Sequence, residues 1–205
     1  MERYAQLLLE WNRTVNLTGA RTIEEVHGHI ADADRLLALS WDGIKRVIDV
    51  GSGGGLPAIP LALRLPDVHF SLLDANTRKC AFLQHVAATL AMANVRVLLG
   101  RAEDLGRQPE LREQFDRAIS RAVAQPPVML ELTLPFVRPG GDLLAEVSEL
   151  DPQSLTGVAR LLGGGVPHLR HGPSDRDYVL MVDKVEPTPA QYPRRAGLPN
   201  RKPLA

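Results

Sequence analysis

The stretch RVIDVGSGGGLPAIPLAL, residues 46–63, runs an apolar, strand-like segment directly into a glycine cluster and then into a second apolar segment. Gly51, Gly53 and Gly55 follow the strand at alternate positions. Glycine lets the backbone adopt positive φ and lets a ligand approach without hindrance from a Cβ atom. Pro57 suits the first turn of a helix, where its missing N–H costs no hydrogen bond. The stretch therefore predicts a sharp strand–turn–helix unit whose turn permits close approach of a ligand.

Short apolar strands alternate with longer helical runs through the middle of the chain. Strands are expected over 46–50, 68–74, 95–100 and 115–122, with helices starting near 57 and covering 77–90 and about 127–136. Such alternation is typical of βαβ units in a mostly parallel sheet with helices on both faces. A further strand within 137–147 and a last one over 177–185, separated by an irregular interval, predict that a hairpin-like strand completes the sheet.

Two flanking regions differ from this alternating part, which we place at residues 44–186. In residues 1–43 apolar side chains recur at helical spacing, and Thr22 followed by Glu25 predicts a capping box, so we expect an N-terminal helical extension. Residues 187–205 are rich in proline, lack periodicity, and carry four basic residues and no acidic one from Tyr192 onward. We expect them to form an extended basic tail rather than a packed element.

Composition limits the partners that the chain can have. Its 205 residues suffice for one domain with a sizeable core, and its 24 Lys and Arg residues balance 24 Asp and Glu residues, so any surface for a polyanion must be local. The lone Cys80 excludes an internal disulfide and a cysteine-based metal site. The sequence shows no secretory signal and no apolar run long enough to cross a bilayer. It predicts a cytoplasmic protein with no metal and no membrane association.

Three interpretations of the glycine turn compete. Dinucleotide binding requires G-x-G-x-x-G, but counted from Gly51 the third glycine is replaced by Leu56. S-adenosylmethionine needs only a looser G-x-G-x-G turn, since it has no pyrophosphate to place at the helix N-terminus; the third possibility is a tight turn without a ligand. Asp74 ends the second strand 23 residues after Gly51 and could accept the ribose hydroxyls of either cofactor, or cap the helix that starts near Thr77.

Segments further along the chain favour S-adenosylmethionine. In GRAEDL, residues 100–105, Ala102 and Glu103 follow the third strand, where a backbone amide and a carboxylate can bracket an adenine edge. LPFVRPGGDLLAEV, residues 134–147, resembles the approach to the fifth strand of class I methyltransferases. The sequence has no hydride-transfer constellation such as a Tyr-x-x-x-Lys pair. We therefore predict a class I, Rossmann-like S-adenosylmethionine-dependent methyltransferase fold: a mostly parallel seven-stranded sheet with helices on both faces, plus N-terminal helices.

Seven ordered segments together resemble one family, the RsmG (glucose-inhibited division protein B) family of bacterial 16S rRNA guanine-N7 methyltransferases. They are LLLEWNRTVNLTGAR (7–21), HIADADRLL (29–37), DVGSGGGLPAIPLAL (49–63), LLDANTRKCAFL (72–83), GRAEDL (100–105), FDRAISRAVA (115–124) and YPRRAGLPNRKPL (192–204). One departure concerns Val147 and Ser148, which stand where many members have a lysine-glycine pair.

The resemblance implies a set of site residues. The cofactor contacts it implies, together with the remaining glycines of the turn, are Gly51, Gly53, Gly55, Leu56, Asp74, Ala102, Glu103 and Arg121. Arg121 would lie beside both the cofactor and the entering guanine, as the catalytic residue. Guanine N7 has a lone pair and no proton, so it can attack the sulfonium methyl group without a general base, and no catalytic triad is expected.

The implied substrate is 16S rRNA or the small ribosomal subunit, and we expect a monomer. RNA contacts are expected from the tail, through Arg194, Arg195, Arg201 and Lys202. His27, His29 and Asp32 have helical spacing and could form a polar face toward substrate, with a metal site the less favoured interpretation. Two alternatives stay open: a non-catalytic nucleotide-sensing or RNA-binding module, and a methyltransferase for a different substrate.

Overall fold

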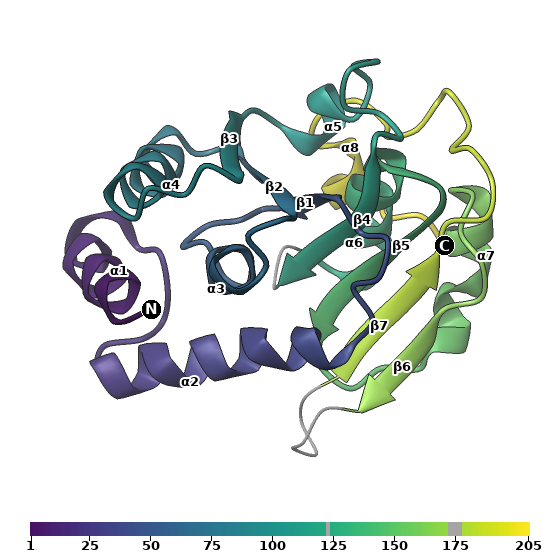
Figure 1. Ribbon diagram of the computed structural model, residues 1–205. Coiled ribbons are helices and arrows are strands. Elements are labelled where there is room, and N and C mark those ends of the chain that lie inside the picture. Colours follow the sequence, from purple (N-terminus) through teal and green to yellow (C-terminus); the bar gives the residue numbers. More distant parts are fainter. Residues whose placement is uncertain (122–123, 172–177) are drawn as a thin grey trace.

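The computed structural model describes residues 1–121, 124–171 and 178–205, and its strands form one seven-stranded sheet in the order β3-β2-β1-β4-β5-β7-β6 (Figure 1). The strands are β1 (Arg46–Val50), β2 (His69–Asp74), β3 (Val95–Leu99), β4 (Phe115–Arg121), β5 (Val137–Val147), β6 (His168–His171) and β7 (Tyr178–Asp183). β1 to β5 are parallel, whereas β7 is antiparallel to both β5 and β6. The predicted sheet, including its hairpin at the end, is confirmed.

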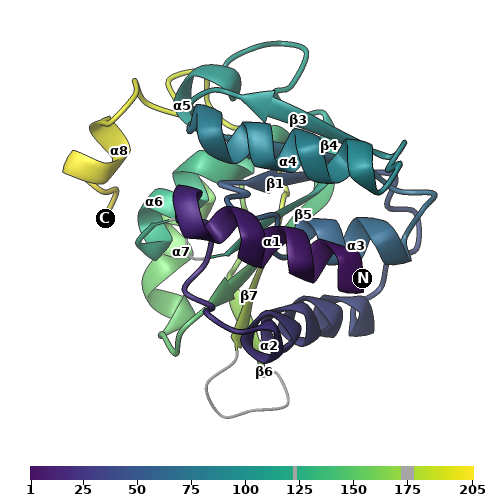
Figure 2. The same ribbon diagram turned by 90° about the vertical axis from the view of Figure 1, so that its left-hand side faces the viewer.

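Helices cover both faces of the sheet. One layer holds α1 (Glu2–Val15), α2 (Ile23–Asp34), α3 (Ala58–Arg64) and α4 (Thr77–Thr89), seen toward the viewer in Figure 2. The other side has α5 (Ala102–Leu105), α6 (Pro126–Thr133), α7 (Thr156–Leu161) and α8 (Leu198–Arg201). Successive strand residues point to opposite faces, so Val47 and Leu72 join the core under the first layer, while Ile48 and Leu73 join the core under the second.

The N-terminal helices are part of the first layer. Thr22 accepts a hydrogen bond from Glu25 N–H at 3.3 Å, and the Glu25 carboxylate accepts one from Arg21 N–H at 2.6 Å, so the start of α2 is capped from both directions. α1 packs on α2 and α4, and α2 packs on α3. A 3₁₀ turn, Arg35–Ala38, continues α2 toward the edge of β4 and β5.

The irregular interval that the sequence placed before the last strand contains regular elements. It holds a 3₁₀ turn at Pro152–Leu155, then α7, then β6. β6 has the sequence HLRH and is mostly exposed at the sheet edge, so it shows no apolar alternation to identify it. The predicted strand ends at 122 and 177 lie outside the described residues.

The position of β1 defines where a ligand can bind. β1 has β2 on one side and β4 on the other, so the strand order reverses there. In open parallel sheets ligands bind at such a switch point, outside the carboxyl ends of the strands. The glycine turn that follows β1 and the ends of β4 and β5 all lie at this edge.

Candidate cofactor and substrate site

The glycine turn is held against the neighbouring strand by its own backbone. Gly51 N–H and Ser52 N–H both donate to the carbonyl of Leu73 at the end of β2, at 2.8 and 3.0 Å. Gly53 and Gly55 have φ of 54° and 84°, which favours glycine. A Cβ atom on Gly55 would lie 2.5 Å from Ile59, whereas one on Gly53 would meet nothing closer than 3.7 Å. Gly55 therefore closes the turn on α3, whereas a Cβ atom on Gly53 would be in ordinary contact with Gly51 O and Lys79 Nζ, without a clash.

Asp74 connects β2 to this turn. One carboxylate oxygen accepts Gly53 N–H at 2.9 Å and the other accepts Asn76 N–H at 2.8 Å. Asn76 caps α4, because its side chain accepts the N–H groups of Arg78 and Lys79. Asp74 thus does not cap α4; it holds the turn and is nearly buried at the switch point.

The first layer braces the turn from behind, a role that sequence reasoning missed. Tyr4 of α1 is fully buried and its hydroxyl donates to Gly54 O at 2.7 Å. A Cβ atom on Gly54 would lie 3.0 Å from both Leu17 O and Leu8 Cδ1. The N-terminal segment is consequently in direct contact with the turn, and the Tyr4–Gly54 hydrogen bond joins residues 50 apart in sequence.

Asp49 is a second missed residue. It is 1% exposed, and neither carboxyl oxygen has a hydrogen-bond partner in the described residues. Burial raises the pKa of Asp49 well above its usual range, and the negative charges of Glu146 and Asp74 raise it further. The available sequence signal was an acidic residue in the otherwise apolar strand RVIDV. A buried carboxyl group of this kind indicates a site for a cationic ligand group.

Ala102 and Glu103 form the start of α5, beyond β3, and both are buried. Glu103 Oε1 accepts the Gly197 N–H at 2.9 Å and an Arg101 guanidinium N–H at 3.0 Å. Burial alone would raise the pKa of Glu103, but these hydrogen bonds outweigh it and hold the pKa below its usual value. Glu103 therefore links the predicted adenine end of the site to the C-terminal segment.

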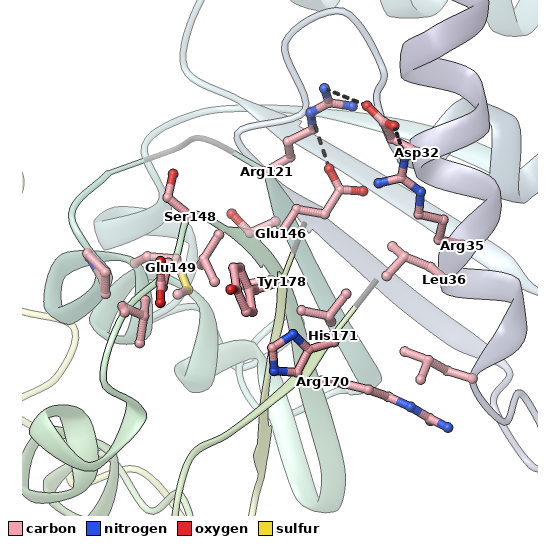
Figure 3. Close-up of a pocket in the computed structure, with 18 of the residues that line it drawn as sticks. Asp32, Arg35, Leu36, Arg121, Glu146, Ser148, Glu149, Arg170, His171 and Tyr178 are labelled. Atoms are coloured by element: carbon pink, nitrogen blue, oxygen red, sulfur yellow. Dashed lines mark ion pairs between the residues drawn. The ribbon is translucent and has the colours of Figure 1, made fainter. Parts of the chain in front are cut away.

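Arg121 ends β4 and is surrounded by acceptors (Figure 3). Its Nη2 lies 2.9 Å from His29 Nδ1 and 3.5 Å from Asp32 Oδ2, and its Nε lies 3.2 Å from Glu146 Oε2. His29 and Asp32 thus face Arg121, as the helical spacing suggested, whereas His27 points to Glu2 of α1, 3.0 Å away. No group of three metal-ligating side chains occurs among the described residues.

A pocket of about 970 Å³ opens beside Arg121 at the carboxyl ends of β4 and β5. Its wall comes from α2 and the following 3₁₀ turn, from the start of α6, and from the β6–β7 hairpin (Figure 3). Charged side chains on it are Asp32, Arg35, Arg121, Glu146, Glu149 and Arg170. Val147 and Ser148 also line it, and all the cationic side chains on this wall are arginines. The glycine turn, Asp74 and Glu103 are not among the residues that line this pocket.

The expectation of an extended, unpacked tail is wrong. Tyr192 and Pro193 are buried, and Arg112 donates hydrogen bonds to the carbonyls of Thr188 and Tyr192 at 2.6 and 2.8 Å. Residues 198–201 form α8, which packs on α6. We call residues 187–205 the C-terminal segment. The residues that hold this segment in place are far away in the sequence, so its own composition gave no sign that it packs on the protein.

The four basic residues predicted to contact RNA are placed differently from one another. Arg194 binds the fully buried Glu131 of α6 through its backbone N–H at 2.8 Å and through its guanidinium group, with Nη2 at 2.6 Å from Oε2. Arg195, Arg201 and Lys202 are exposed. Arg194 is therefore an anchor of the segment, and three cations remain at its surface.

Known proteins resemble the chain in sequence and in fold. A family model described as rRNA small subunit methyltransferase G (GidB) matches residues 1–151. Proteins named ribosomal RNA small subunit methyltransferase G from Moorella thermoacetica and Roseiflexus castenholzii are 39% and 42% identical, over 100% and 98% of this chain and 89% of each relative.

Solved structures agree on the fold. The mitomycin 7-O-methyltransferase MmcR superposes with a TM-score of 0.66 at 12% identity, over 89% of this chain and 60% of its own. The Thermus thermophilus 16S rRNA N2 G1207 methyltransferase, solved with AdoMet and guanosine, superposes with a TM-score of 0.55 at 16% identity, over 78% of this chain and 40% of its own. None of the helices in the described part of the chain is long and apolar enough to cross a membrane.

Proposed function

Because the chain belongs to the rRNA small subunit methyltransferase G family, we propose that it transfers the methyl group of S-adenosylmethionine to N7 of a guanine in 16S rRNA. The observation that carries the proposal is the Arg121–Glu146 ion pair, which lines the pocket at the carboxyl ends of β4 and β5. In this pair the Arg121 guanidinium can donate a hydrogen bond and the Glu146 carboxylate can accept one from a base that enters the site. We place this activity in a cytoplasmic monomer.

The residues at the turn fit S-adenosylmethionine. Gly53 has no side chain to hinder a ligand, Asp74 can exchange a backbone contact for ribose hydroxyls, and the buried Asp49 carboxyl suits the ligand's cationic amino acid end. Ala102 and Glu103 close the adenine end, with Leu56 and the flanking glycines along the side. When bound, the cofactor supplies a methyl group activated by a positively charged sulfur.

Arg121 and Glu146 together match one edge of guanine. Guanine presents the O6 acceptor next to the N1–H donor, and an arginine beside a carboxylate presents a donor next to an acceptor. Contact through this edge leaves N7 free on the other side of O6. Adenine has the reverse order, a donor amino group beside an acceptor N1, and would meet both side chains with like groups. The pair therefore both orients guanine and disfavours adenine.

The remaining contribution of the protein is positioning. Because N7 carries no proton, no side chain has to remove one, and the work of the site is to align nitrogen, methyl carbon and sulfur while excluding water. His29 and Asp32 hold Arg121 from the α2 side, so its guanidinium is oriented before a base enters. The exposed Arg195, Arg201 and Lys202 provide phosphate contacts, and Arg194 contributes by holding the C-terminal segment in place.

The test is transfer of labelled methyl from S-adenosylmethionine to small ribosomal subunits, followed by chemical cleavage at N7-methylguanine to map the modified base. The wild-type protein should modify one guanine. Glu146→Gln should reduce the rate at least tenfold, because the amide can offer N1–H an acceptor but no charge. Glu149→Gln, on the same pocket wall, is the matched control and should stay within twofold. Methylation at another base atom would refute the proposal.

A further inference from the structure

The sheet carries a second hollow at the edge opposite the glycine turn, where the parallel strands begin. It has a volume of about 300 Å³ and is lined from the starts of β1, β2 and β3, with Phe115 on one side. The ionisable side chains on this wall are Arg46, His69 and Arg96, and no carboxylate lines it in the described part of the chain. Such a lining suits an anion.

The register of the strands brings these groups onto one face of the sheet. Arg46 pairs with His69 across β1 and β2, and Ser71 pairs with Arg96 across β2 and β3. Directly paired residues point to the same face, as do residues two apart on one strand. Arg96 lies two strands across from Arg46 and two residues further along, so at about 4.8 Å per strand and about 3.3 Å per residue their backbones lie roughly 12 Å apart. Two arginine side chains at this spacing can converge on one tetrahedral anion.

Both guanidinium groups are held by neutral partners. Arg96 Nε donates to Ser71 Oγ at 2.7 Å, and Ser71 is 4% exposed. The Arg46 guanidinium lies over the Phe115 ring, 5.3 Å from its centroid. Neither arginine forms an ion pair with the described residues. Partial burial lowers the pKa of Arg96, and the positive charge of Arg46 lowers it further. An anion between them would relieve the repulsion between these two charges.

The acidic residue next to this hollow is already engaged. Asp116 Oδ1 accepts from Arg138 at 2.8 Å, and Oδ2 accepts the N–H groups of Lys45 and Arg46 at 2.8 and 2.7 Å. Arg117, on the neighbouring strand, shows the contrasting arrangement, because both its Nε and Nη2 lie 2.6 Å from Asp142. Arg117 is therefore neutralised by a carboxylate, whereas Arg46 and Arg96 are held in place by neutral partners and keep their charge unneutralised.

We propose that this hollow, the Arg46–Arg96 site, binds a phosphate of the RNA backbone at a distance from the methylated guanine. Phe115 is 1% exposed and lies under Arg46, so it offers no face on which a base could stack. The site therefore positions RNA without reading its sequence. It also answers how a chain with zero formal charge holds a polyanion, because its uncompensated cations are concentrated locally. The proposal rests on the RNA substrate given above.

The experiment measures binding of a fluorescent 16S rRNA fragment at a series of KCl concentrations, with no cofactor and no methyl transfer. In the double variant Arg46→Gln/Arg96→Gln, binding should weaken, and the slope of log K against log salt should become shallower by roughly 0.7–0.9, the value for one phosphate contact. S-adenosylmethionine affinity should be unchanged. Because this assay reports binding alone, a wild-type protein that binds but does not methylate would contradict the proposed function and leave this site testable.

The matched control is Arg3→Gln/Arg160→Gln, which removes the same charge from two exposed arginines elsewhere. An equal loss in the control would show a net-charge effect and overturn the proposal, as would an unchanged slope in the Arg46–Arg96 variant. Inorganic phosphate that shifts the Arg96 Nε–H resonance while the RNA slope is unchanged would show a site for a free anion, which also overturns it. Should the double variant not fold, Arg96→Gln alone is measured and should still reduce the slope.

Discussion

Charged side chains hold both the glycine turn and the C-terminal segment in place, but they do so in different ways. At the turn, Asp74 accepts backbone N–H groups from Gly53 and Asn76. In the C-terminal segment, Arg194 meets Glu131 from a helix 63 residues earlier in the chain. The contacts of Asp74 are formed by backbone groups of the turns next to it. The Arg194–Glu131 ion pair forms only when the C-terminal segment has packed on α6. The comparison predicts that substitutions in the segment affect folding and those at the turn affect binding.

The largest effect is expected from Arg194→Ala. The substitution leaves the Glu131 carboxylate, which is fully buried, without its guanidinium partner. Removing one member of a buried ion pair costs about 3–5 kcal/mol, because the remaining charge stays desolvated. Urea denaturation of Arg194→Ala and of the exposed neighbour variant Arg195→Ala provides the measurement. The second variant should remain within about 0.5 kcal/mol of wild type; equal losses would mean that the ion pair does not anchor the segment.

A pH-dependent effect is expected from Lys184, which is buried beneath the same segment. Its ammonium group donates to Leu134 O and Leu162 O at 3.1 and 3.2 Å and to the Thr188 hydroxyl. Burial lowers the pKa of Lys184 to about 8.

In the unfolded chain Lys184 has its ordinary pKa near 10.5, so between pH 8 and pH 10.5 the unfolded chain holds a proton that the folded chain has lost. The free energy of unfolding therefore rises with pH in that window, by up to about 3 kcal/mol. Below pH 8 both states are protonated and the contribution is constant. Denaturation of wild type and Lys184→Met across this range isolates the effect, since the variant lacks the titrating group. A stability difference between the two that does not change with pH would show that Lys184 keeps its ordinary pKa.

At the turn, Asp74→Asn should act on the cofactor and little on folding. The amide retains one acceptor for a backbone N–H but cannot accept from two partners and from ribose. We expect S-adenosylmethionine to bind at least tenfold more weakly, about 1.4 kcal/mol, by calorimetry. Asp67→Asn, in the exposed turn before β2, is the control. If Asp74→Asn lowers the free energy of unfolding while the protein that remains folded binds S-adenosylmethionine as tightly as wild type, the role of Asp74 is structural.

The smallest effect joins the two regions. Gly197 has φ of 77° and donates its N–H to Glu103, which closes the predicted adenine end. Gly197→Ala should cost about 1 kcal/mol in backbone strain, since a Cβ there meets nothing within 4 Å. Gly43→Ala has the same strain, with φ of 76° and open space, but no contact with Glu103. Only Gly197→Ala should also weaken S-adenosylmethionine binding. Identical affinities in the two variants would show that the C-terminal segment does not contribute to cofactor binding.

Much of the sheet and of the turn could be predicted because their signals are local. Apolar strands, glycines after β1 and an acid at the end of β2 each occupy a few consecutive residues. Asp49 was missed because one acid in an apolar strand has no pattern of its own, although its burial distinguishes it in the structure. The segment after Pro187 was wrongly expected to be unpacked. Its partners Glu131 and Arg112 lie in an apolar helical run and in a loop, and no local sequence pattern indicates that either contacts this segment.

The most direct test of the account is single-turnover methyl transfer to small ribosomal subunits by wild type and Arg121→Ala, with RNA and S-adenosylmethionine affinities measured alongside. Arg121 contacts His29, Asp32 and Glu146 at the junction of cofactor edge and pocket. We expect a rate at least a hundredfold lower, about 2.7 kcal/mol in the barrier, with much smaller losses in both affinities and in the thermal midpoint. A folded Arg121→Ala protein that methylates guanine N7 at the wild-type rate would contradict it.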